Sequence, residues 1–415
     1  MGKKILIINA GSSSIKFKIY NAANKEDIAW GICERIFIDG SFKLSYFDEK
    51  DEKKSKEQKV IEKNNFNNHV DALDYLFERL ANLKIINDLS DIIAVGHRVV
   101  QGGDFFEDSV IIDNDIIQKI EKLIPLAPLH NEPQLNVINI LKEKLSDAKQ
   151  VAAFDTSFHQ TIPKVNSTYA VPEEWRVKHG VKKYGAHGLS YRYLTDTVKE
   201  ILKKERVNVI ACHLGNGASV CAIKENNSLN TTMGLTPLDG LIMGTRSGSI
   251  DPSIHNYISK QKNLSIDEID SILNNESGLK ALCGHSDFRE VFTKSVTGNN
   301  YDFTIEIYAK KVSDFVVQYI NELDNKVDAI VFSGGIGENN KDVVKRIIDN
   351  IKIANYKTNI NLSIEKTKLS ISSFNFNKKE KKHSSKKINT LFSKKIYVIK
   401  TNEELVILND ILKLI

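Results

Sequence analysis

Apolar and polar residues follow the same order in two segments, one near the start of the chain and one near its middle. Residues 4–20 read as an apolar strand, a turn of glycine and serine, and a second strand whose Ile15, Phe17 and Ile19 share one face. Residues 207–223 repeat this order, with a Gly-Asn-Gly turn between two apolar strands. Because each segment begins one half of the chain, the pattern predicts a duplicated architecture.

Three further segments have the apolar spacing of helices, and short apolar runs between them read as buried strands. The strands are expected at residues 91–95, 149–154, 327–332 and 396–399. The end of the chain has the spacing of a closing helix that could pack back on the first domain. Strands that alternate with helices indicate an α/β fold. The helical faces comprise Val70, Leu73, Phe77 and Leu80; Leu194, Val198, Ile201 and Leu202; Ile305, Ala309, Val312 and Val316; and, at the end, Leu408, Ile411, Leu412 and Ile415.

The length of the chain indicates two domains, because a single core rarely grows beyond roughly 250 to 300 residues. The chain has 415 residues, of which 41% are apolar and 27% charged, as in a globular protein. Its net charge of +5 is too small to indicate nucleic-acid binding. Two charged segments carry little chemistry: residues 48–59 read as a solvated loop, and residues 377–387 as a lysine-rich connection.

The four cysteines lie far apart and form no CxxC pair, so we expect neither a zinc site nor a disulfide framework. A reducing cytoplasm fits this composition best. The first apolar run is too short for the core of a signal peptide, and no run approaches the roughly 18 apolar residues of a membrane span. We therefore expect a cytoplasmic protein with no membrane and no nucleic-acid partner.

The first turn has a composition suited to phosphate. Between Asn9 and Lys16, backbone N–H groups and three serine hydroxyls surround a tight turn, and the lysine follows directly behind it. Taken alone, a turn of glycine and serine is more often only a turn. Both interpretations stay open at this point.

Two arginines lie beside glycines. Arg98 ends a predicted buried strand, where a guanidinium can hold a carboxylate or a phosphate through two parallel hydrogen bonds. Arg246 has a glycine on each side in the sequence, which lets a ligand approach the backbone closely. Single arginines of this kind are mostly structural ion-pair partners, but two in similar settings favour anion binding.

Other polar candidates are weaker when each is taken alone. His130, His187 and His213 lie beside small residues and lack the spacing of a metal site, and a lone histidine is more often structural. Asp155 closes a strand, where it would either face a cleft or cap a helix. The segment 334–339, GGIGEN, follows an apolar strand and precedes a helical pattern, which is a nucleotide-binding arrangement. The sequence contains neither a Rossmann fingerprint nor a P-loop.

Together these segments resemble the acetate kinase family, within the superfamily of acetate and sugar kinases, Hsp70 and actin. The resemblance extends from residue 4 to the end of the chain. It rests on ten motifs in the family's order: N-x-GSSS-x-K at 9–16, GHRVV-x-GG at 96–103, APLHN at 127–131, FDT-x-FHQT at 154–161, YG-x-HG at 184–188, HLGNG-x-S at 213–219, TPL-x-GL-x-MGTRSG-x-IDP at 236–252, SD-x-R at 286–289, GGIGEN at 334–339 and TNEEL at 401–405.

The resemblance implies two duplicated ribonuclease H-like domains of the actin-like ATPase type, with the active site in the cleft between them. The first would span residues 1–155 and be completed by the final helix, from about residue 405 to 415. The second, residues 156–404, would bind the nucleotide. The implied reaction is reversible, direct in-line transfer of the γ-phosphate of ATP to acetate, giving acetyl phosphate and ADP. The implied cofactor is Mg²⁺, with Mn²⁺ as an alternative, and the implied assembly is a homodimer.

The resemblance also assigns roles to individual residues. The catalytic set is Asp155, Arg98, His187, Arg246 and His130, and the substrate-binding set is Arg98, Val100, Leu129, Ala186 and Pro237. Asn9 and Glu403 would hold the metal. The nucleotide-binding set comprises Ser12, Ser14, Lys16, His213, Asn216, Gly217, Asp287, Phe288, Arg289, Gly335, Ile336, Gly337 and Asn339.

Elementary chemistry agrees with these roles. A carboxylate nucleophile has a pKa near ~4, so at neutral pH it is already deprotonated and needs no general base. The remaining work is to bring two anions together and to stabilise the charge on the transferring group. A divalent cation, two arginines and a histidine are suited to it.

The sequence departs from the family pattern at a few positions. Ala186 stands where the family usually has a phenylalanine that walls the pocket for the acetate methyl group. We expect either relaxed selectivity toward propionate or butyrate, or a neighbouring side chain that fills the space. Tyr191 and Gln101 each stand where a histidine is common, and Lys400 replaces a proline before TNEEL; none of these changes removes a predicted ligand.

Three alternatives to an acetate kinase stay open. The first is a kinase for propionate or another short-chain fatty acid. The second is an ATPase like actin or Hsp70 that drives a binding cycle, although such a protein has no use for Arg98 and Arg246 on a small acid. The third, a catalytically silent interaction protein, is disfavoured because every predicted ligand is present.

Overall fold

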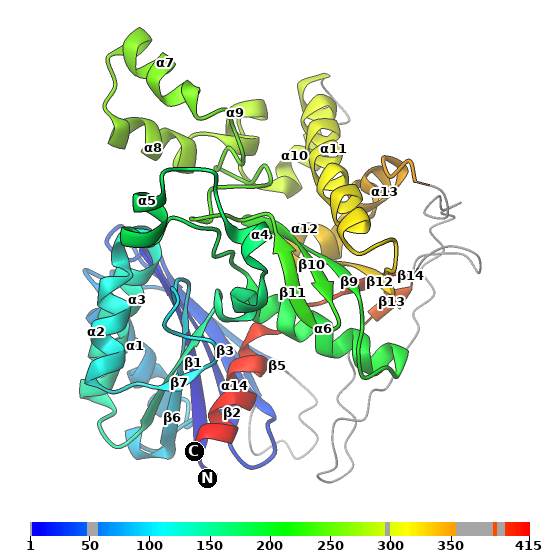
Figure 1. The fold of residues 1–415 in the computed structure, drawn as a ribbon. Coiled ribbons are helices and arrows are strands. Elements are labelled where there is room, and N and C mark those ends of the chain that lie inside the picture. The colour runs from blue at the N-terminus through cyan, green and yellow to red at the C-terminus, as the bar shows by residue number, and fades with distance from the viewer. Residues whose placement is uncertain (1, 48–56, 295–298, 354–384, 388–394) are drawn as a thin grey trace. The chain divides into compact units, whose positions relative to one another are not determined.

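The computed structural model describes residues 2–47, 57–294, 299–353, 385–387 and 395–415. The chain forms two compact units (Figure 1). Unit 1 comprises Met1–Ser157 and Asn402–Ile415, and unit 2 comprises Phe158–Thr401. The chain therefore leaves unit 1 after its first strands and helices and returns to it for the final helix.

Unit 1 is built on an eight-stranded sheet with the order β5-β4-β3-β2-β1-β6-β8-β7. Strands β1, β6 and β8 are parallel to one another, and the remaining neighbours pair antiparallel. The strands are β1 (Lys4–Gly11), β2 (Ser14–Asn21), β3 (Asp27–Glu34), β4 (Ser41–Phe47), β5 (Glu57–Lys63), β6 (Ile92–Val99), β7 (Val110–Ile111) and β8 (Lys149–Phe154).

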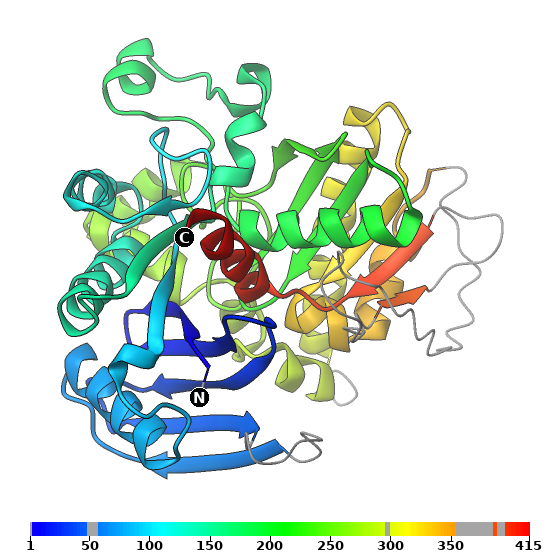
Figure 2. The same ribbon diagram turned by 90° about the horizontal axis from the view of Figure 1, so that it is seen from below.

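Helices cover both faces of this sheet because successive residues of its central strands point to opposite sides. On β1, Leu6 and Ile8 pack in one core cluster with residues of α1 and α3, while Ile7 lies beside the final helix α14. Figure 2 shows α14 lying along the central strands. The helices of unit 1 are α1 (His69–Asn82), α2 (Asn114–Lys122), α3 (Pro128–Lys144) and α14 (Glu403–Leu414), with 3-10 turns at η1 (Leu89–Asp91) and η2 (Ile124–Leu126).

Unit 2 is built on a six-stranded sheet with the order β11-β10-β9-β12-β14-β13. Its strands are β9 (Val209–Leu214), β10 (Ala218–Lys224), β11 (Asn227–Thr231), β12 (Ala329–Ser333), β13 (Ser385–Lys387) and β14 (Lys395–Ile399). Its helices are α4 (Lys164–Ser167), α5 (Glu173–Lys178), α6 (Gly188–Leu202), α7 (Ser253–Lys262), α8 (Ile266–Asn275), α9 (Gly278–Cys283), α10 (Phe288–Lys294), α11 (Asn299–Glu322), α12 (Gly334–Asn339) and α13 (Lys341–Asp349); the turn η3 (Ser157–Thr161) precedes them.

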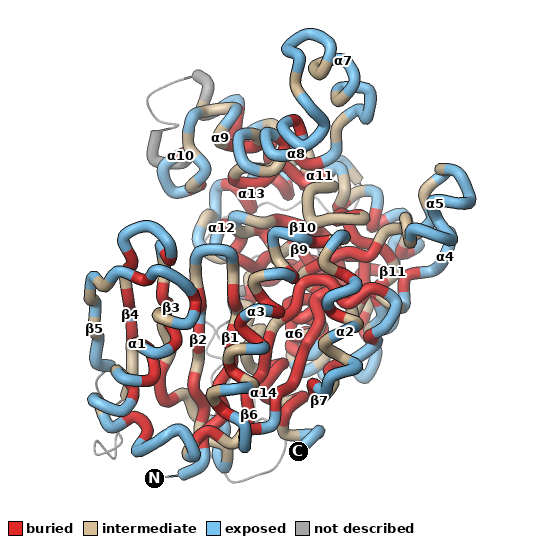
Figure 3. Tube along the Cα trace, turned by 90° about the vertical axis from the view of Figure 1, so that its left-hand side faces the viewer, coloured by how far each residue is buried: buried red, intermediate tan, exposed pale blue. Residues whose placement is uncertain are grey.

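The two sheets contain the same five-stranded arrangement. In unit 1 it is β3-β2-β1-β6-β8 and in unit 2 it is β11-β10-β9-β12-β14. In each, a hairpin with a third antiparallel strand is joined on its other side to two parallel strands. The predicted duplication and the α/β class are therefore confirmed, and Figure 3 shows β9 and β10 of unit 2 largely buried.

Most of the predicted elements are present, with a few corrections. In α1, Leu73, Phe77 and Leu80 are buried as expected, but Val70 is 38% exposed. The prediction of a loop over 48–59 was wrong for its last residues, which begin β5; this edge strand is exposed, so its polar sequence resembles that of a loop. The last residues of the predicted 377–387 connection form β13, and 48–56 and 377–384 lie outside the described residues.

No helix in the described part of the chain combines the length and the apolar character needed to cross a bilayer.

The core of unit 1 contains one histidine whose titration should affect stability. His97 on β6 is 2% exposed, and its Nε2 lies 2.8 Å from the side-chain oxygen of Gln150. Burial lowers the pKa of His97 to about 4, from an ordinary value of 6.5. Between these values the unfolded chain binds a proton that the folded protein does not. The stabilisation is therefore full above pH 6.5 and is lost as the pH falls toward 4, by about 3 kcal/mol in all.

We expect His97→Gln to make unfolding less sensitive to acid. Urea unfolding at about pH 7 and pH 5 should show a difference in the free energy of unfolding that is smaller than in the parent protein by about 2 kcal/mol. The same substitution at His179, which is exposed, is the matched control. An equal difference in the parent and in His97→Gln would contradict the role given to the buried imidazole.

Candidate active-site residues

Three predicted site residues of unit 1 meet at one edge of its sheet. Asn9 lies near the carboxyl end of β1, Arg98 near that of β6, and Asp155 directly after β8. The register pairs Ile8 with His97 across the first two strands, and the N–H of Asp155 donates to the carbonyl of Val99 at 2.9 Å. Since the carboxyl ends of adjacent parallel strands share an edge, the topology brings these side chains together.

Arg98 is held by two carboxylates. Its Nη2 and Nε donate to the two oxygens of Asp155 at 2.6 and 3.1 Å, and its Nε lies 3.5 Å from Glu403 Oε2. The side chains of Arg98 and Asp155 are 17% and 1% exposed. Burial alone would lower the pKa of the guanidinium, but the charges of Asp155 and Glu403 raise it overall. Asp155 thus fixes the orientation of Arg98.

Glu403 is brought to Arg98 by the start of α14. The side chain of Asn402 caps this helix by accepting from the N–H of Leu405 at 3.2 Å. Burial raises the pKa of Glu403, the nearby guanidinium of Arg98 lowers it, and the neighbouring Glu404 raises it. The net direction is upward, as for a carboxylate that has lost water and would gain from a further cation.

A small hollow opens at this edge of unit 1. We call Asn9, Lys16, Arg98, Asp155 and Glu403 the Arg98 group; four of its members line the hollow, and Asp155 is hydrogen-bonded to Arg98. Asn9 and Lys16 are directly opposite each other across the first hairpin. The lining residues are Ile7, Asn9, Lys16, Phe17, Arg98, Glu403, Glu404 and Ile407.

The oxygens of this group fit a magnesium ion held together with a ligand. Within the described ranges, no three or more histidine, cysteine or acidic residues form a cluster able to hold a metal alone. Mg²⁺ in phosphoryl-transfer sites usually takes one or two carboxylates and completes its shell with phosphate oxygens and water. The amide of Asn9 and the partly desolvated carboxylate of Glu403 meet that requirement.

The other predicted residues of unit 1 do not line the hollow. Ser12 and Ser14 are at the tip of the first hairpin, where the carbonyl of Gly11 is 2.9 Å from His69 Nε2. Val100 is buried. Leu129, which is 54% exposed, and His130 lie in the first turn of α3.

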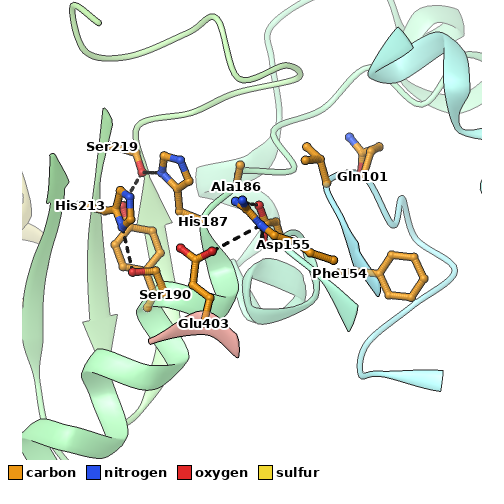
Figure 4. Close-up of polar contacts among 12 residues, drawn as sticks. Gln101, Phe154, Asp155, Ala186, His187, Ser190, His213, Ser219 and Glu403 are labelled. Atoms are coloured by element: carbon orange, nitrogen blue, oxygen red, sulfur yellow. Dashed lines mark hydrogen bonds and ion pairs between the residues drawn. The ribbon is translucent and has the colours of Figure 1, made fainter. Parts of the chain in front are cut away.

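In unit 2, His187 has an unusual backbone and a defined side-chain partner. It precedes α6 with φ +66°, a left-handed conformation that is rare outside glycine and is typical of sites where the surroundings impose it. Its Nδ1 lies 2.8 Å from the hydroxyl of Ser219, which also contacts the phenol of Tyr191 (Figure 4). Ser219 lies on β10 and Tyr191 on α6.

His213 is stacked on His187, with ring centroids 4.4 Å apart and an angle of 29° between the rings. Its Nδ1 lies 2.8 Å from the hydroxyl of Ser190, and that hydroxyl lies 2.9 Å from the hydroxyl of Thr401. His213 belongs to the last part of β9, and Thr401 follows β14. Strand ends thus position the unit 2 residues in the same way as in unit 1.

Arg246 approaches the same place from a glycine-rich loop. A Cβ built on Gly217 would lie 3.5 Å from His187 Nε2 and 3.9 Å from Arg246 Nη1, so both donors reach the spot that this glycine leaves free. Burial lowers the pKa of Arg246. The loop packs closely because the N–H of Gly244 donates to the Asn216 carbonyl at 3.0 Å. We call His187, His213, Asn216, Gly217 and Arg246 the His187 group.

The GGIGEN segment forms a short helix rather than the turn that we expected before a helix. Gly334 has φ +76° and follows β12, and α12 begins with it. The carboxylate of Glu338 accepts from the N–H groups of Gly334 at 3.0 Å and Thr401 at 3.3 Å. A Cβ on Gly335 would meet no atom within 4 Å, so the backbone is open to a ligand there. Ile336 and Gly337 are buried, and Asn339 donates to the Gly335 carbonyl at 2.8 Å.

The SD-x-R segment contributes one exposed ion pair and one buried ring. Arg289 is bound to the carboxylate of Asp287 through both its Nε and its Nη2. The ring of Phe288 is 4% exposed and packs against Tyr308, with centroids 5.2 Å apart. A ligand would therefore reach Phe288 through its backbone rather than its ring.

Ala186 is enclosed in the core of unit 2. Its side chain is 2% exposed, and its carbonyl lies 2.9 Å from Nε2 of His159. Burial lowers the pKa of His159 to about 4, so this histidine is neutral at physiological pH and donates to that carbonyl. Pro237, the other predicted wall residue of unit 2, is half-buried.

Sequence reasoning missed several residues that hold these groups in place. Ser219 was visible only as part of a motif, and Ser190, Glu338 and Thr401 were given no role. The hairpin register offered one signal, because a three-residue tip after Leu214 places Ser219 directly opposite His213. The contacts from α6 carry no comparable sequence signal.

Comparisons with known proteins agree on one family. The model of the acetokinase family matches residues 4–409. The acetate kinase of Mycoplasma pneumoniae is 46% identical over 412 residues, covering 99% of this chain and 98% of the relative. Among solved structures, a propionate kinase from Francisella tularensis has a TM-score of 0.86 at 39% identity, covering 98% of each chain. The acetate kinase of Porphyromonas gingivalis has a TM-score of 0.85 at 31% identity, covering 100% of each chain.

The position of Glu403 should depend on close packing of α14 against Gly96 of β6. A Cβ on Gly96 would lie 2.5 Å from Ile407 Cγ2 and 2.7 Å from Ile411 Cδ1. We expect Gly96→Ala to destabilise the protein by about 1 to 3 kcal/mol, as for other overpacked cores, and to lower activity by displacing Glu403.

Adding Ile411→Val, which removes the Cδ1 atom in question, should restore part of both losses. Chemical denaturation and activity of the single and double variants would measure this. If the double variant is no better than Gly96→Ala, the contact with α14 is not the cause.

Proposed function

Because this chain belongs to the acetokinase family, we propose that it is an acetate kinase, which transfers the γ-phosphoryl group of ATP to acetate in a reversible reaction. The products are acetyl phosphate and ADP. The observation that best supports this activity is the Arg98 group, in which a buried guanidinium is oriented by Asp155 beside Asn9, Lys16 and Glu403. Such a group recognises a small anion and has no evident use in an ATPase that only drives a binding cycle.

In this proposal, Arg98 binds the carboxylate of acetate. The two hydrogen bonds to Asp155 prevent the guanidinium from rotating away, which makes Asp155 essential without contact with acetate. Acetate is ionised at neutral pH, so no group has to remove a proton from it. Val100, Leu129, Ala186 and Pro237 are the proposed contacts of its methyl group, and His130 is proposed to act near the transferring group.

The His187 group would bind the phosphoryl group that is transferred. Arg246 Nη1 and His187 Nε2 both face the place beside Gly217, so two donors can stabilise the charge that spreads over the equatorial oxygens. Asn216 and His213 would contact the phosphate chain.

Asn9 and Glu403 would hold Mg²⁺ together with phosphate oxygens. When bound, the ion would neutralise charge on the phosphates. The nucleotide itself is proposed to contact the first hairpin through Ser12, Ser14 and Lys16. In unit 2 it is proposed to contact Gly217, the GGIGEN segment and the SD-x-R segment. The proposed unit 2 contacts are Gly217, Asp287, Phe288, Arg289, Gly335, Ile336, Gly337 and Asn339.

Formation of an acyl phosphate, trapped with hydroxylamine, tests the proposal. Mg-ATP is supplied with acetate, propionate or butyrate in parallel. Acyl phosphate from acetate at the highest kcat/KM supports an acetate kinase. ATP hydrolysis that does not depend on any carboxylate would contradict the proposal and would indicate an ATPase like actin or Hsp70.

Removal of either arginine should abolish most of the activity. We expect Arg98→Ala and Arg246→Ala each to lower kcat by on the order of 10² to 10³, as for loss of one key electrostatic donor. Arg35→Ala and Arg206→Ala are matched controls, since these arginines lie on the surfaces of units 1 and 2 and pair with Asp39 and Glu225. Normal turnover in either site variant would exclude the assigned role.

A propionate kinase is the second candidate, because a solved structure of that name is 39% identical to this chain and because Ala186 replaces a larger wall residue. If Ala186 lies against the acid, Ala186→Gly should raise the ratio of propionate to acetate kcat/KM by about fourfold, the value of one buried methylene. Ala186→Phe should lower that ratio. Thermal unfolding of each variant separates this effect from damage to the core in which Ala186 is buried. An unchanged ratio in both variants would show that other residues set the preference.

From the family resemblance we also propose that the protein forms a homodimer and is located in the cytoplasm. Light scattering on the purified protein measures the mass of the assembly and so tests the dimer.

A further inference from the structure

The side chain of His187 ends a chain of three hydrogen-bonding groups inside unit 2. The phenol of Tyr191 contacts the hydroxyl of Ser219, and this hydroxyl lies 2.8 Å from His187 Nδ1. Tyr191 and Ser219 are both 0% exposed, so water does not complete their bonding. Each hydrogen of this chain must therefore find an acceptor within it.

The phenol of Tyr191 determines which group donates in each hydrogen bond of this series. Within the described residues, the only acceptor near the hydroxyl hydrogen of Tyr191 is Ser219. If Tyr191 did not donate to Ser219, a buried O–H would be left without an acceptor, which is costly.

The same reasoning shows which atom donates in the hydrogen bond between Ser219 and His187. Because Ser219 accepts from Tyr191, its own hydrogen must point elsewhere, and its other partner in the described structure is His187 Nδ1. A hydrogen on Nδ1 would leave the buried serine hydroxyl without an acceptor. Nδ1 therefore accepts, and a neutral imidazole that accepts at Nδ1 carries its hydrogen at Nε2.

We propose that Tyr191 and Ser219 are positioning residues that hold His187 in its neutral Nε2–H form, so that Nε2 donates a hydrogen bond to the anionic group bound beside Gly217 and Arg246. This inference rests on the proposed function for the identity of that group, which is the transferring phosphoryl. It makes His187 a hydrogen-bond donor rather than a base, in keeping with an acceptor that needs no deprotonation. Tyr191, which departs from the family's common histidine, supplies the first donor.

The test measures the protonation of the ring directly. Protein labelled with ¹⁵N in histidine is examined by NMR at neutral pH in the absence of substrate, and the His187 signals are assigned by their loss in His187→Gln. We expect the parent to show a hydrogen on Nε2 and none on Nδ1. Ser219→Ala should convert this into a mixture of tautomers, Tyr191→Phe should shift it partly, and Ser219→Thr, which keeps the hydroxyl, should restore it.

Activity provides the second readout. We expect Ser219→Ala to lower kcat about tenfold, the size of one net hydrogen bond, with little change in KM for acetate. Tyr193→Phe removes a phenol from the same helix but leaves Tyr191, Ser219 and His187 in place, so it serves as the control for Tyr191→Phe.

Two results would overturn the proposal: a hydrogen on Nδ1 of His187 in the parent, or an Nε2–H tautomer that persists unchanged in both Ser219→Ala and Tyr191→Phe. Because the tautomer is measured without substrate, a failure here is distinguishable from a failure of the proposed reaction.

Discussion

Much of unit 1 depends on the burial of one positive charge. The guanidinium of Arg98 is only 17% exposed, and a charge so placed is tolerated only when it is paired and hydrogen-bonded. Asp155 meets this need from the end of β8, and Glu403 meets it from the first turn of α14. Two elements that are far apart in the sequence are thus tied to β6. The arrangement that stabilises Arg98 also fixes its orientation at the edge of the hollow, where the proposed reaction would use it.

The duplicated architecture places different chemistry at equivalent strand ends. In unit 1, the parallel strands end in charged side chains around Arg98. In unit 2, the matching strands end in His213, in Gly334 and, just beyond β14, in Thr401. Charge pairing therefore determines geometry in the first unit, whereas neutral hydrogen bonds and close backbone packing determine it in the second. One topology thus provides two similar edges, and the local sequence decides which side chains lie at each.

The sequence pattern was sufficient for the two hairpins, for β6, β8, β12 and β14 and for the duplication, because strand periodicity is local. It placed Arg98 and Asp155 each at the end of a strand, but it did not predict their ion pair, which follows from β6 and β8 being parallel neighbours. The partnership of Ser219 with Tyr191 could not be anticipated, because it depends on how α6 packs on the sheet. The first residues of the edge strand β5 were mistaken for a loop because an exposed strand needs few apolar residues. Each error concerns a feature set by tertiary packing rather than by periodicity.

The route of the chain has a consequence for biosynthesis. Residues up to Ser157 contain all eight strands of the first sheet, yet the helix that covers one face and supplies Glu403 follows the whole of unit 2 in the sequence. During translation the amino-terminal part emerges first and can begin to fold, but Ile7 and Gly96 lack their helical cover until α14 has been made. Assembly around Arg98 therefore comes after the synthesis of unit 2. A nascent chain that stops before Glu403 lacks the second carboxylate that contacts Arg98.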